Sequence, residues 1–319
     1  MYEKLLNKIK EYDKITIFRH VRPDGDCIFS QQALYLFLKD NFKNKQIKCC
    51  GNEKYDLGGR YDNVKDSFVL DSLAIVVDTA TDIRCDDFRF LASKYIIKID
   101  HHPAVSNYGD INIVHPEMSS TCELLATILF SKQFSKYKMS KKVCEYLYCG
   151  MLTDTLNFQT ANTTASTLSI AAKLVEKANL VPSILHEYLF DCSLDTFKKK
   201  NLIREKLVVS KGVGYIKLNK KQLDEIGMEP VEAKNNIDEI GSIKELNIWA
   251  FAVENNGGWD CSIRSKKPYI INRVASKYNG GGHANAAAVK HINASDLDNL
   301  LKDLISISTK HKKWQKAFI

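Results

Sequence analysis

Short, uninterrupted apolar runs mark the first part of the chain, and a polar residue follows each of them. The runs lie within Lys14–Arg19, Ala74–Val77 and Tyr95–Ile99, and all are rich in β-branched residues. Runs of this length without alternation are typical of strands that are buried on both faces of a parallel sheet. Helical spacing follows in five segments, which are Cys27–Asp40, Glu123–Ser131, Ser140–Met151, Thr164–Lys177 and Ser183–Phe190.

The pattern changes after a charged segment over Ser193–Ser210, which we interpret as a connecting helix. Gly212–Leu218 then predicts a strand. Asn247–Val253 and Trp259–Arg264 alternate around an Asn-Asn-Gly-Gly turn, which indicates a β-hairpin. A further helix is expected over Ile270–Tyr278.

These patterns predict an α/β protein with two domains. Residues 1–192 should form a mostly parallel sheet flanked by helices, 193–211 a helical linker, and 212–319 a smaller mixed α/β domain. A length of 319 residues suits two domains of ordinary size.

The composition indicates the cellular location of the protein but not any reaction that it catalyses. Lys and Arg number 46 and Asp and Glu 38, so the net charge is +8. That mild excess fits an anionic substrate without requiring one. The 9 cysteines lack CxxC spacing, which favours free thiols and a cytoplasmic location. No apolar stretch reaches about 18 residues and the first ten residues are charged, so we expect no membrane span and no signal peptide.

Residues that can bind metal ions follow the three apolar runs. His20 follows the first run, Asp78 the second and Asp100 the third. Ligands of open α/β sheets bind beyond the carboxyl ends of the strands, so these side chains should gather at one edge. The other candidates nearby in the sequence are Asp24, Asp26, His101, His102 and Asp154.

A mixed set of imidazoles and carboxylates favours Mn²⁺, Fe²⁺ or Co²⁺. Two carboxylates as close as Asp24 and Asp26 repel each other unless a cation neutralises them. Taken singly, each aspartate is more simply a helix cap or turn residue, and each histidine a structural side chain. The set favours a metal site because every member falls at a predicted strand end or turn.

Six motifs occur in an order that resembles one family. HVRPDGD, VVDTA, DHH and GMLTDT resemble the motifs of the DHH phosphoesterase superfamily. SIRS at Ser262–Ser265 and GGGHANAAA at Gly280–Ala288 resemble its DHH-associated C-terminal domain. The length and single-module arrangement are similar to the nanoRNase subgroup, which also removes the 3′-phosphate of pAp.

The resemblance implies two divalent metal ions, with Mn²⁺ as the first choice, that share the carboxylate of Asp78. His20, Asp24 and Asp78 would hold one ion. The ligands of the other would be Asp26, Asp78, His101 and Asp154. His102 would face the scissile phosphate as a catalytic residue together with Asp78, and Asp100 would orient an imidazole.

The second domain carries the residues expected to bind substrate. Gly280, Gly281 and Gly282 free the backbone to approach an anion, although a flexible turn would also explain them. His283 and Arg264 can each donate to phosphate oxygens. Ser262 in the same domain and Arg84 in the first domain complete the set.

The expected function is hydrolysis of short oligoribonucleotides, of pAp, or of both. Alternatives are a phosphodiesterase for linear pApA, a pyrophosphatase, a long-strand exonuclease, and a nucleotide sensor without catalysis. A homodimer is also an option. Cys27, Phe29 and Ala288 depart from the usual family pattern, which puts the fit of the substrate in question but leaves every expected metal ligand in place.

Overall fold

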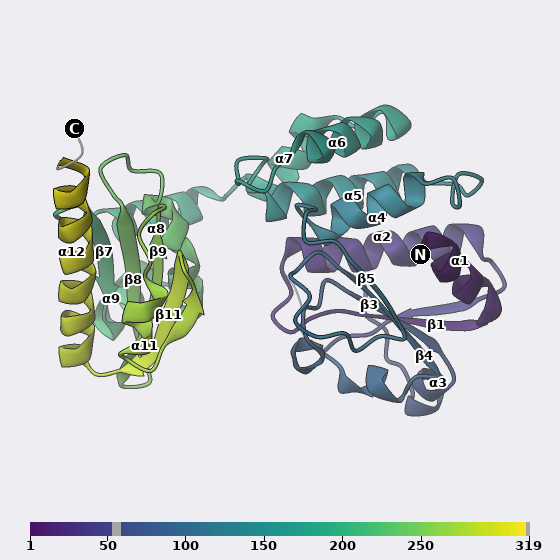
Figure 1. Ribbon diagram of the computed structural model, residues 1–319, viewed down its shortest axis with the longest axis horizontal. Helices are drawn as coiled ribbons and strands as arrows, with labels where there is room; N and C mark the ends of the chain where they lie inside the picture. The colour runs from purple at the N-terminus through teal and green to yellow at the C-terminus, as the bar shows by residue number, and fades with distance from the viewer. Residues whose placement is uncertain (53–58, 317–319) are drawn as a thin grey trace. The chain divides into compact units, whose positions relative to one another are not determined.

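The computed structural model describes residues 1–52 and 59–316, which fold into two compact units. The first unit is Met1–Asp191 and the second begins at Cys192 (Figure 1). The segment predicted as a linker contains a helix, α8 (Leu194–Arg204), and a strand, β6 (Val208–Ser210). Both elements fall within the second unit.

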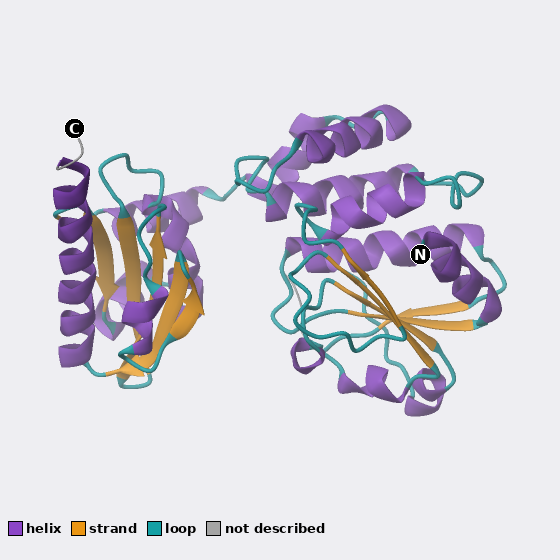
Figure 2. Ribbon diagram, viewed as in Figure 1, coloured by secondary structure: helices purple, strands orange, loops and turns teal. Residues whose placement is uncertain are grey.

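A five-stranded sheet forms the centre of the first unit, in the order β2-β1-β3-β4-β5 (Figure 2). Every neighbouring pair is parallel. The three apolar runs are strands β1 (Lys14–Phe18), β3 (Leu73–Val77) and β4 (Tyr95–Asp100). Two further strands, β2 (Gln46–Cys49) and β5 (Ile111–Val114), have weaker patterns and were not predicted. The predicted parallel α/β architecture is confirmed.

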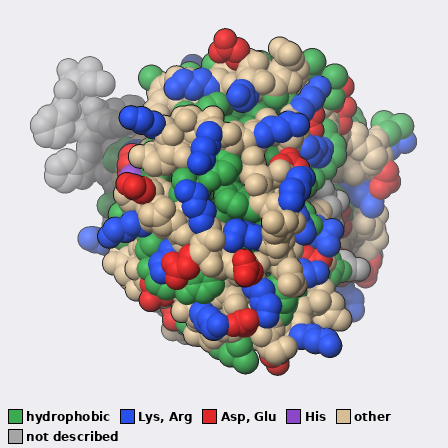
Figure 3. Space-filling view, turned by 90° about the vertical axis from the view of Figure 1, so that its right-hand side faces the viewer, with side chains coloured by type: hydrophobic (Ala, Val, Ile, Leu, Met, Phe, Trp, Pro, Cys, Tyr) green, Lys and Arg blue, Asp and Glu red, His purple; other side chains and the backbone are tan. Residues whose placement is uncertain are grey.

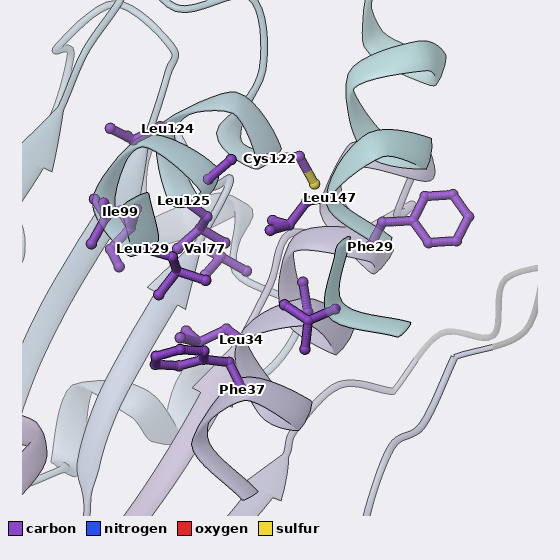
Figure 4. Packing of buried hydrophobic residues seen from close by; sticks show 14 of the residues in the cluster. Phe29, Leu34, Phe37, Val77, Ile99, Cys122, Leu124, Leu125, Leu129 and Leu147 are labelled. Atoms are coloured by element: carbon purple, nitrogen blue, oxygen red, sulfur yellow. The ribbon is translucent and has the colours of Figure 1, made fainter. Parts of the chain in front are cut away.

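Strand β3 shows why these runs do not alternate between apolar and polar residues. Leu73, Ile75 and Val77 pack into the apolar cluster on one face of the sheet. Ala74 and Val76 pack into a second cluster on the other face. In Figure 4, side chains of α2, α4 and α5 meet the strands around Val77 on the first face. Both faces are therefore covered, as a buried parallel sheet requires.

The five helices predicted for this unit are all present as α2 and α4 to α7, with ends that differ by a few residues. The complete set of helices in the described part of this unit, including those not predicted, is α1 (Tyr2–Glu11), α2 (Gly25–Asn41), α3 (Asp66–Leu70), η1 (Asp82–Arg84), η2 (Phe88–Ala92), α4 (Thr121–Phe130), α5 (Lys141–Asp154), α6 (Ala165–Ala178) and α7 (Pro182–Phe190).

The second unit is built on a mixed sheet in the order β10-β11-β9-β8-β7-β6. Only the pairing of β7 with β8 is parallel within this sheet. The predicted hairpin is confirmed, because β8 pairs with β9 through the turn at Asn256 and Gly257. The strands beyond β6 are β7 (Val213–Leu218), β8 (Ile248–Asn255), β9 (Gly258–Ser265), β10 (Gly281–His283) and β11 (Ala286–Ile292).

Helices cover both faces of this second sheet. Leucines of α12 (Ala294–Lys316) pack on one face together with α11 (Asn272–Ser276). The other face packs over β7 and β8 against α8, α9 (Lys220–Ile226), α10 (Pro230–Lys234) and η3 (Asn235–Ile240). Helix α11 corresponds to the helix predicted over Ile270–Tyr278, but it is only five residues long.

No helix in the described part of the chain is long and apolar enough to cross a membrane. The face drawn in Figure 3 carries many Lys and Arg side chains, with acidic and apolar side chains between them. On this face the Lys and Arg side chains form no single continuous patch. The positive net charge by itself therefore does not indicate a binding surface here.

Gly150 offers a test of the packing that brings α2, α4 and α5 together. A Cβ atom at this position would lie 2.2 Å from Sγ of Cys122 and 3.0 Å from Oδ1 of Asp26. Alanine normally stabilises a helix interior over glycine by about 0.5–1 kcal/mol. Here we expect Gly150→Ala to lower the free energy of unfolding by roughly 1–3 kcal/mol, because the overpacked helices must move apart.

Chemical denaturation measures this change. In a Cys122→Ala background, which removes the sulfur atom, the same substitution should cost distinctly less. Equal losses in both backgrounds would contradict the packing explanation.

Candidate metal centre

Strands β1, β3 and β4 are neighbours in the sheet, so their carboxyl ends meet at one edge. His20 follows β1, Asp78 follows β3, and His101 follows β4 directly. Asp24 caps the amino end of α2, Asp26 lies in the first turn of that helix, and Asp154 is the last residue of α5. The sequence analysis placed every candidate at a strand end or turn, which is wrong for Asp26 and Asp154, because both are helical residues.

His20 forms the first part of the site. Its side chain is buried, and its Nδ1 lies 2.8 Å from the carbonyl oxygen of Val21. Its Nε2 lies 3.3 Å from Oδ2 of Asp78 and 3.7 Å from Oδ2 of Asp24. Burial alone would lower the pKa of His20, but the hydrogen bonds with Asp24 and Asp78 outweigh it and raise the pKa.

His101 and Asp154 form the second part. Nε2 of His101 lies 3.6 Å from Oδ1 of Asp78 and 3.4 Å from Oδ2 of Asp154. Asp26, His101 and Asp154 each offer a ligand atom within 4.8 Å of the other two. Asp78 therefore presents Oδ2 to His20 and Oδ1 to His101.

The backbone aims Asp78 into this position. Its φ of 50° is in the left-handed region, which residues other than glycine rarely adopt. Its N–H donates to the carbonyl of Ile99, and the hydroxyl of Thr121 donates to its Oδ1 at 2.9 Å. Local strain that is held by surrounding hydrogen bonds in this way is common at functional sites.

The amino end of α4 holds Asp26. Backbone N–H groups of Thr121 and Cys122 donate to Oδ2 and Oδ1 of Asp26 at 2.7 and 2.9 Å. Helix amino ends favour negative charge, so α4 stabilises the carboxylate of Asp26. Glu123 keeps this helix end in shape by accepting from the amide and hydroxyl of Ser119. Thr121 is a positioning residue for which the sequence analysis assigned no role.

A buried chain of charges supports His102. Nδ1 of His102 lies 2.8 Å from Oδ1 of Asp100, whose Oδ2 lies 3.1 Å from Nζ of Lys98. Lys98 is fully buried and also donates to the carbonyls of Ala80 and Ser106. The hydrogen bond with Asp100 raises the pKa of His102, while burial partly opposes it. The sequence analysis missed Lys98, because a lysine inside a strand gives no signal of burial.

Electrostatics favour a cation among these carboxylates. Burial raises the pKa of Asp26, and the charges of Asp78 and Asp154 raise it further. Burial likewise raises the pKa of Asp154 to about 6, with a further contribution from Asp78. The donor set of imidazole nitrogens and carboxylate oxygens fits divalent transition metals. The arrangement is therefore a candidate site for metal ions.

The substrate residues predicted in the second unit share one face of its sheet. His283, Ala286 and Arg264 form one row across β10, β11 and β9. In the parallel row two residues away, Gly281 and Ser262 both pair with Ala288. Directly paired residues point to the same face, and so do residues two apart on a strand. That face is the one opposite α12, since the alternate residues pack against its leucines.

Exposure on this face differs from residue to residue. Gly281, Gly282 and His283 are exposed, Gly280 and Arg264 are half-buried, and Ser262 is nearly buried. A flexible turn was the alternative explanation for the glycine segment, but Gly281 and Gly282 belong to the short edge strand β10. Arg84 lies in the first unit, in exposed η1, next to the bridge between His20 and Cys85.

A parallel sheet with an edge of imidazoles and carboxylates for divalent metal ions, followed by a smaller mixed unit, defines a metal-dependent phosphoesterase. The chain belongs to the DHH family. The profile of the DHH family, N-terminal domain, matches residues 14–151, and that of the DHHA1 domain matches residues 210–310.

Relatives of this family match along almost the whole chain. The bifunctional oligoribonuclease and PAP phosphatase NrnA of Bacillus subtilis is 32% identical over 315 residues, which cover 98% of this chain and 100% of that protein. A probable protein of the same description from Streptococcus mutans is 32% identical over 307 residues, or 95% of this chain and 97% of the relative. The crystal structure of an exopolyphosphatase-related protein from Bacteroides fragilis superposes with a TM-score of 0.85 at 25% identity, covering 99% of this chain and 97% of that one.

Asp154 provides a pH test of the metal-free site. Its pKa is about 6 in the folded protein and about 3.9 in an unfolded chain. A carboxyl group whose pKa is raised by folding lowers the free energy of unfolding only where it ionises. The folded protein therefore has its full stability below the unfolded pKa and loses stability as the pH rises through the folded pKa. Under chelation, ionisation of Asp154 should therefore cost little below about pH 4 and on the order of 3 kcal/mol at pH 7.

Asp154→Asn removes this cost, so with excess chelator the variant should be more stable than the parent protein at pH 7 but similar near pH 4. Mn²⁺ should stabilise the parent protein more than the variant. Denaturant unfolding at both pH values measures the difference. A stability difference that is the same at pH 4 and pH 7 would contradict the assigned pKa.

Proposed function

We propose that this protein hydrolyses short oligoribonucleotides to mononucleotides and removes the 3′-phosphate of pAp, using two divalent metal ions, preferentially Mn²⁺. The observation that carries the proposal is Asp78, whose two carboxylate oxygens face different histidines. The named activities of the Bacillus and Streptococcus relatives support the substrate class.

In this proposal His20, Asp24 and Asp78 hold one ion. The second is held by Asp26, Asp78, His101 and Asp154. A pair of such ions stabilises both the attacking and the leaving oxygen of a phosphoryl displacement and makes water more acidic. The residues of the chain hold this arrangement before substrate arrives, which reduces the reorganisation that the reaction would otherwise require.

His102 is the residue that we assign to the phosphate group of the substrate. Its Nδ1 is engaged by Asp100, so Nε2 is the nitrogen that donates to a phosphate oxygen. The raised pKa of His102 favours the cationic ring, which stabilises negative charge that develops on that oxygen. Lys98 and Asp100 keep the ring in this orientation.

We assign substrate binding to the polar face of the second unit. Arg264 and His283 lie in the same row, separated by β11, and so stand roughly 10 Å apart across the strands. Phosphate or sugar oxygens of a short nucleotide are suitable partners for these donors and for the exposed glycine amides. Ser262 and, in the first unit, Arg84 are weaker members of the set.

The cellular setting is also part of the proposal. We place the protein in the cytoplasm, where its eight buried free cysteines stay reduced. Homodimer formation is included as a hypothesis that light scattering can test. The alternatives are a pApA phosphodiesterase and a non-catalytic nucleotide sensor, and both are distinguished by the assay below.

Activity should depend on metal and on Asp78. With Mn²⁺ we expect hydrolysis of pAp and of a 5-mer RNA, weaker action on a 24-mer, and none after exhaustive chelation. Asp78→Ala should lose at least the roughly 10²–10³-fold that removal of one electrostatic contact costs, because both ions lose a ligand. Asp82→Ala, in the same loop but outside the ligand groups, is the matched control.

Rates with pAp, pApA, both RNA lengths and pyrophosphate decide between the alternatives. Preference for pApA alone would favour the dinucleotide phosphodiesterase. Binding without turnover of any of these substrates would favour the sensor and reject the proposal.

Gly281 tests substrate binding separately from folding. A Cβ atom at Gly281 meets nothing within 4 Å, whereas at Gly280 it would lie 2.4 Å from the carbonyl oxygen of Ala288. Gly281→Ala should therefore fold normally, but its methyl group would occupy the open space that a phosphate needs to reach the backbone N–H. Loss of one hydrogen bond to a charged group costs roughly 1.5–3 kcal/mol, so KM for pAp should rise by about tenfold or more.

Gly280→Ala is the contrasting variant and should lose stability. KM and melting temperature of both variants make the comparison, with bis-p-nitrophenyl phosphate as a substrate too short to need these contacts. An unchanged KM for pAp in Gly281→Ala would show that this backbone does not bind the substrate.

A further inference from the structure

Cys27 is a buried thiol beside the first metal position. It lies in the first turn of α2, where its backbone N–H donates to Oδ1 of Asp24, and its side chain is fully buried. Its Sγ, a ring nitrogen of His20 and a carboxylate oxygen of Asp78 all lie within 4.8 Å of one another. Among the described residues, this is the ligand group whose three members are all buried.

The surroundings of Cys27 distinguish it from the other buried cysteines. Each of those belongs to an apolar cluster and has an ordinary packing role. They are Cys49, Cys50, Cys85, Cys122, Cys144, Cys149 and Cys261. Cys27 is a member of none of these clusters, and its sulfur faces an imidazole and a carboxylate instead.

The separations fit a common coordination sphere. A metal–sulfur bond is about 2.3 Å long and a metal–nitrogen bond about 2.0–2.1 Å, so two ligands of one ion lie at most about 4.4 Å apart. Three ligands cannot all lie on opposite sides of one ion, so their mutual separations are roughly 3.5–4 Å. From the upper bound of 4.8 Å, mutual approaches of at most about 1 Å bring the three atoms around one ion.

We propose that Cys27 is a ligand of the ion held by His20, Asp24 and Asp78, so that this position binds thiophilic divalent ions such as Zn²⁺ or Co²⁺ in addition to Mn²⁺. The position formed by Asp26, His101 and Asp154 has only nitrogen and oxygen donors and suits Mn²⁺. Binding forms a metal–sulfur bond, breaks the S–H bond and releases the proton to solvent. The inference rests on the proposed metal-dependent function, and it predicts two chemically different metal positions.

The test is a titration of the metal-free full-length protein with Co²⁺, followed by absorption spectroscopy. A thiolate bound to Co²⁺ gives an intense charge-transfer band in the near ultraviolet, whereas nitrogen and oxygen ligands give only weak visible bands. We expect the intense band in the parent protein, saturating with one Co²⁺ per chain. Cys27→Ala and Cys27→Ser should abolish it, while Cys122→Ala and Cys144→Ala should retain it.

Metal affinity supplies a second readout. Loss of Cys27 should weaken Zn²⁺ binding at the first position by at least the roughly 10- to 100-fold that loss of a residue supporting a ligand costs, and should weaken Mn²⁺ binding less. Circular dichroism of both Cys27 variants confirms that they are folded, and the serine variant preserves the size of the side chain.

Absence of the charge-transfer band from the Co²⁺-loaded parent protein, or its persistence in folded Cys27→Ser, would overturn the inference. Hydrolysis of pAp with Mn²⁺ in the same preparations separates this failure from that of the proposed function. Active protein without the band means that only the sulfur ligand is wrong. Failure of both Co²⁺ and Mn²⁺ to bind rejects both proposals.

Discussion

Repulsion among four carboxylates is the constraint on which the rest of the site depends. Asp24, Asp26, Asp78 and Asp154 converge on one edge of the first sheet, and the two that are most affected, Asp26 and Asp154, have raised pKa values. Like charges in a partly buried setting favour protonation unless a cation is present. The protein supplies part of that compensation through three imidazoles and the amino end of α4. In the proposed function, divalent metal ions would complete it, and their charge would also stabilise a reacting phosphate group.

The core of the first unit is arranged to hold this edge rigid. Gly150 lets α5 lie close to Cys122 of α4 and to Asp26 of α2, whose carboxylate accepts from the amides of Thr121 and Cys122. Lys98 connects the segments after β3 and β4, because it donates to the carbonyls of Ala80 and Ser106 and pairs with Asp100. A buried lysine is costly unless it is paired and hydrogen-bonded. Here the contacts orient His102, so the cost contributes to the preorganisation of the site.

The two units present different kinds of polar groups. The first presents charged side chains at strand and helix ends, where carboxylates and imidazoles can converge on ions. The second presents one face of an antiparallel edge, with Arg264, His283 and exposed glycine amides as donors. Strand ends concentrate ligands at a point, and a sheet face spreads donors along a row. The first suits metal ions, and the second suits the several polar groups of a short nucleotide.

The sequence by itself determined the parallel sheet, the hairpin of the second unit and the grouping of His20, Asp78 and Asp100 at neighbouring strand ends, because continuous β-branched runs followed by polar residues are local patterns. Weakly patterned strands such as β2 and β5, and the short length of α11, did not follow from it. Only the tertiary structure decided that Asp26 accepts from α4, that Lys98 supports Asp100, and that Cys27 faces the metal ligands instead of the apolar core. These contacts join residues from different elements, so they depend on helix packing and strand order. Helix packing and strand order depend on the whole chain, since side chains of different elements come into contact only after the elements have packed.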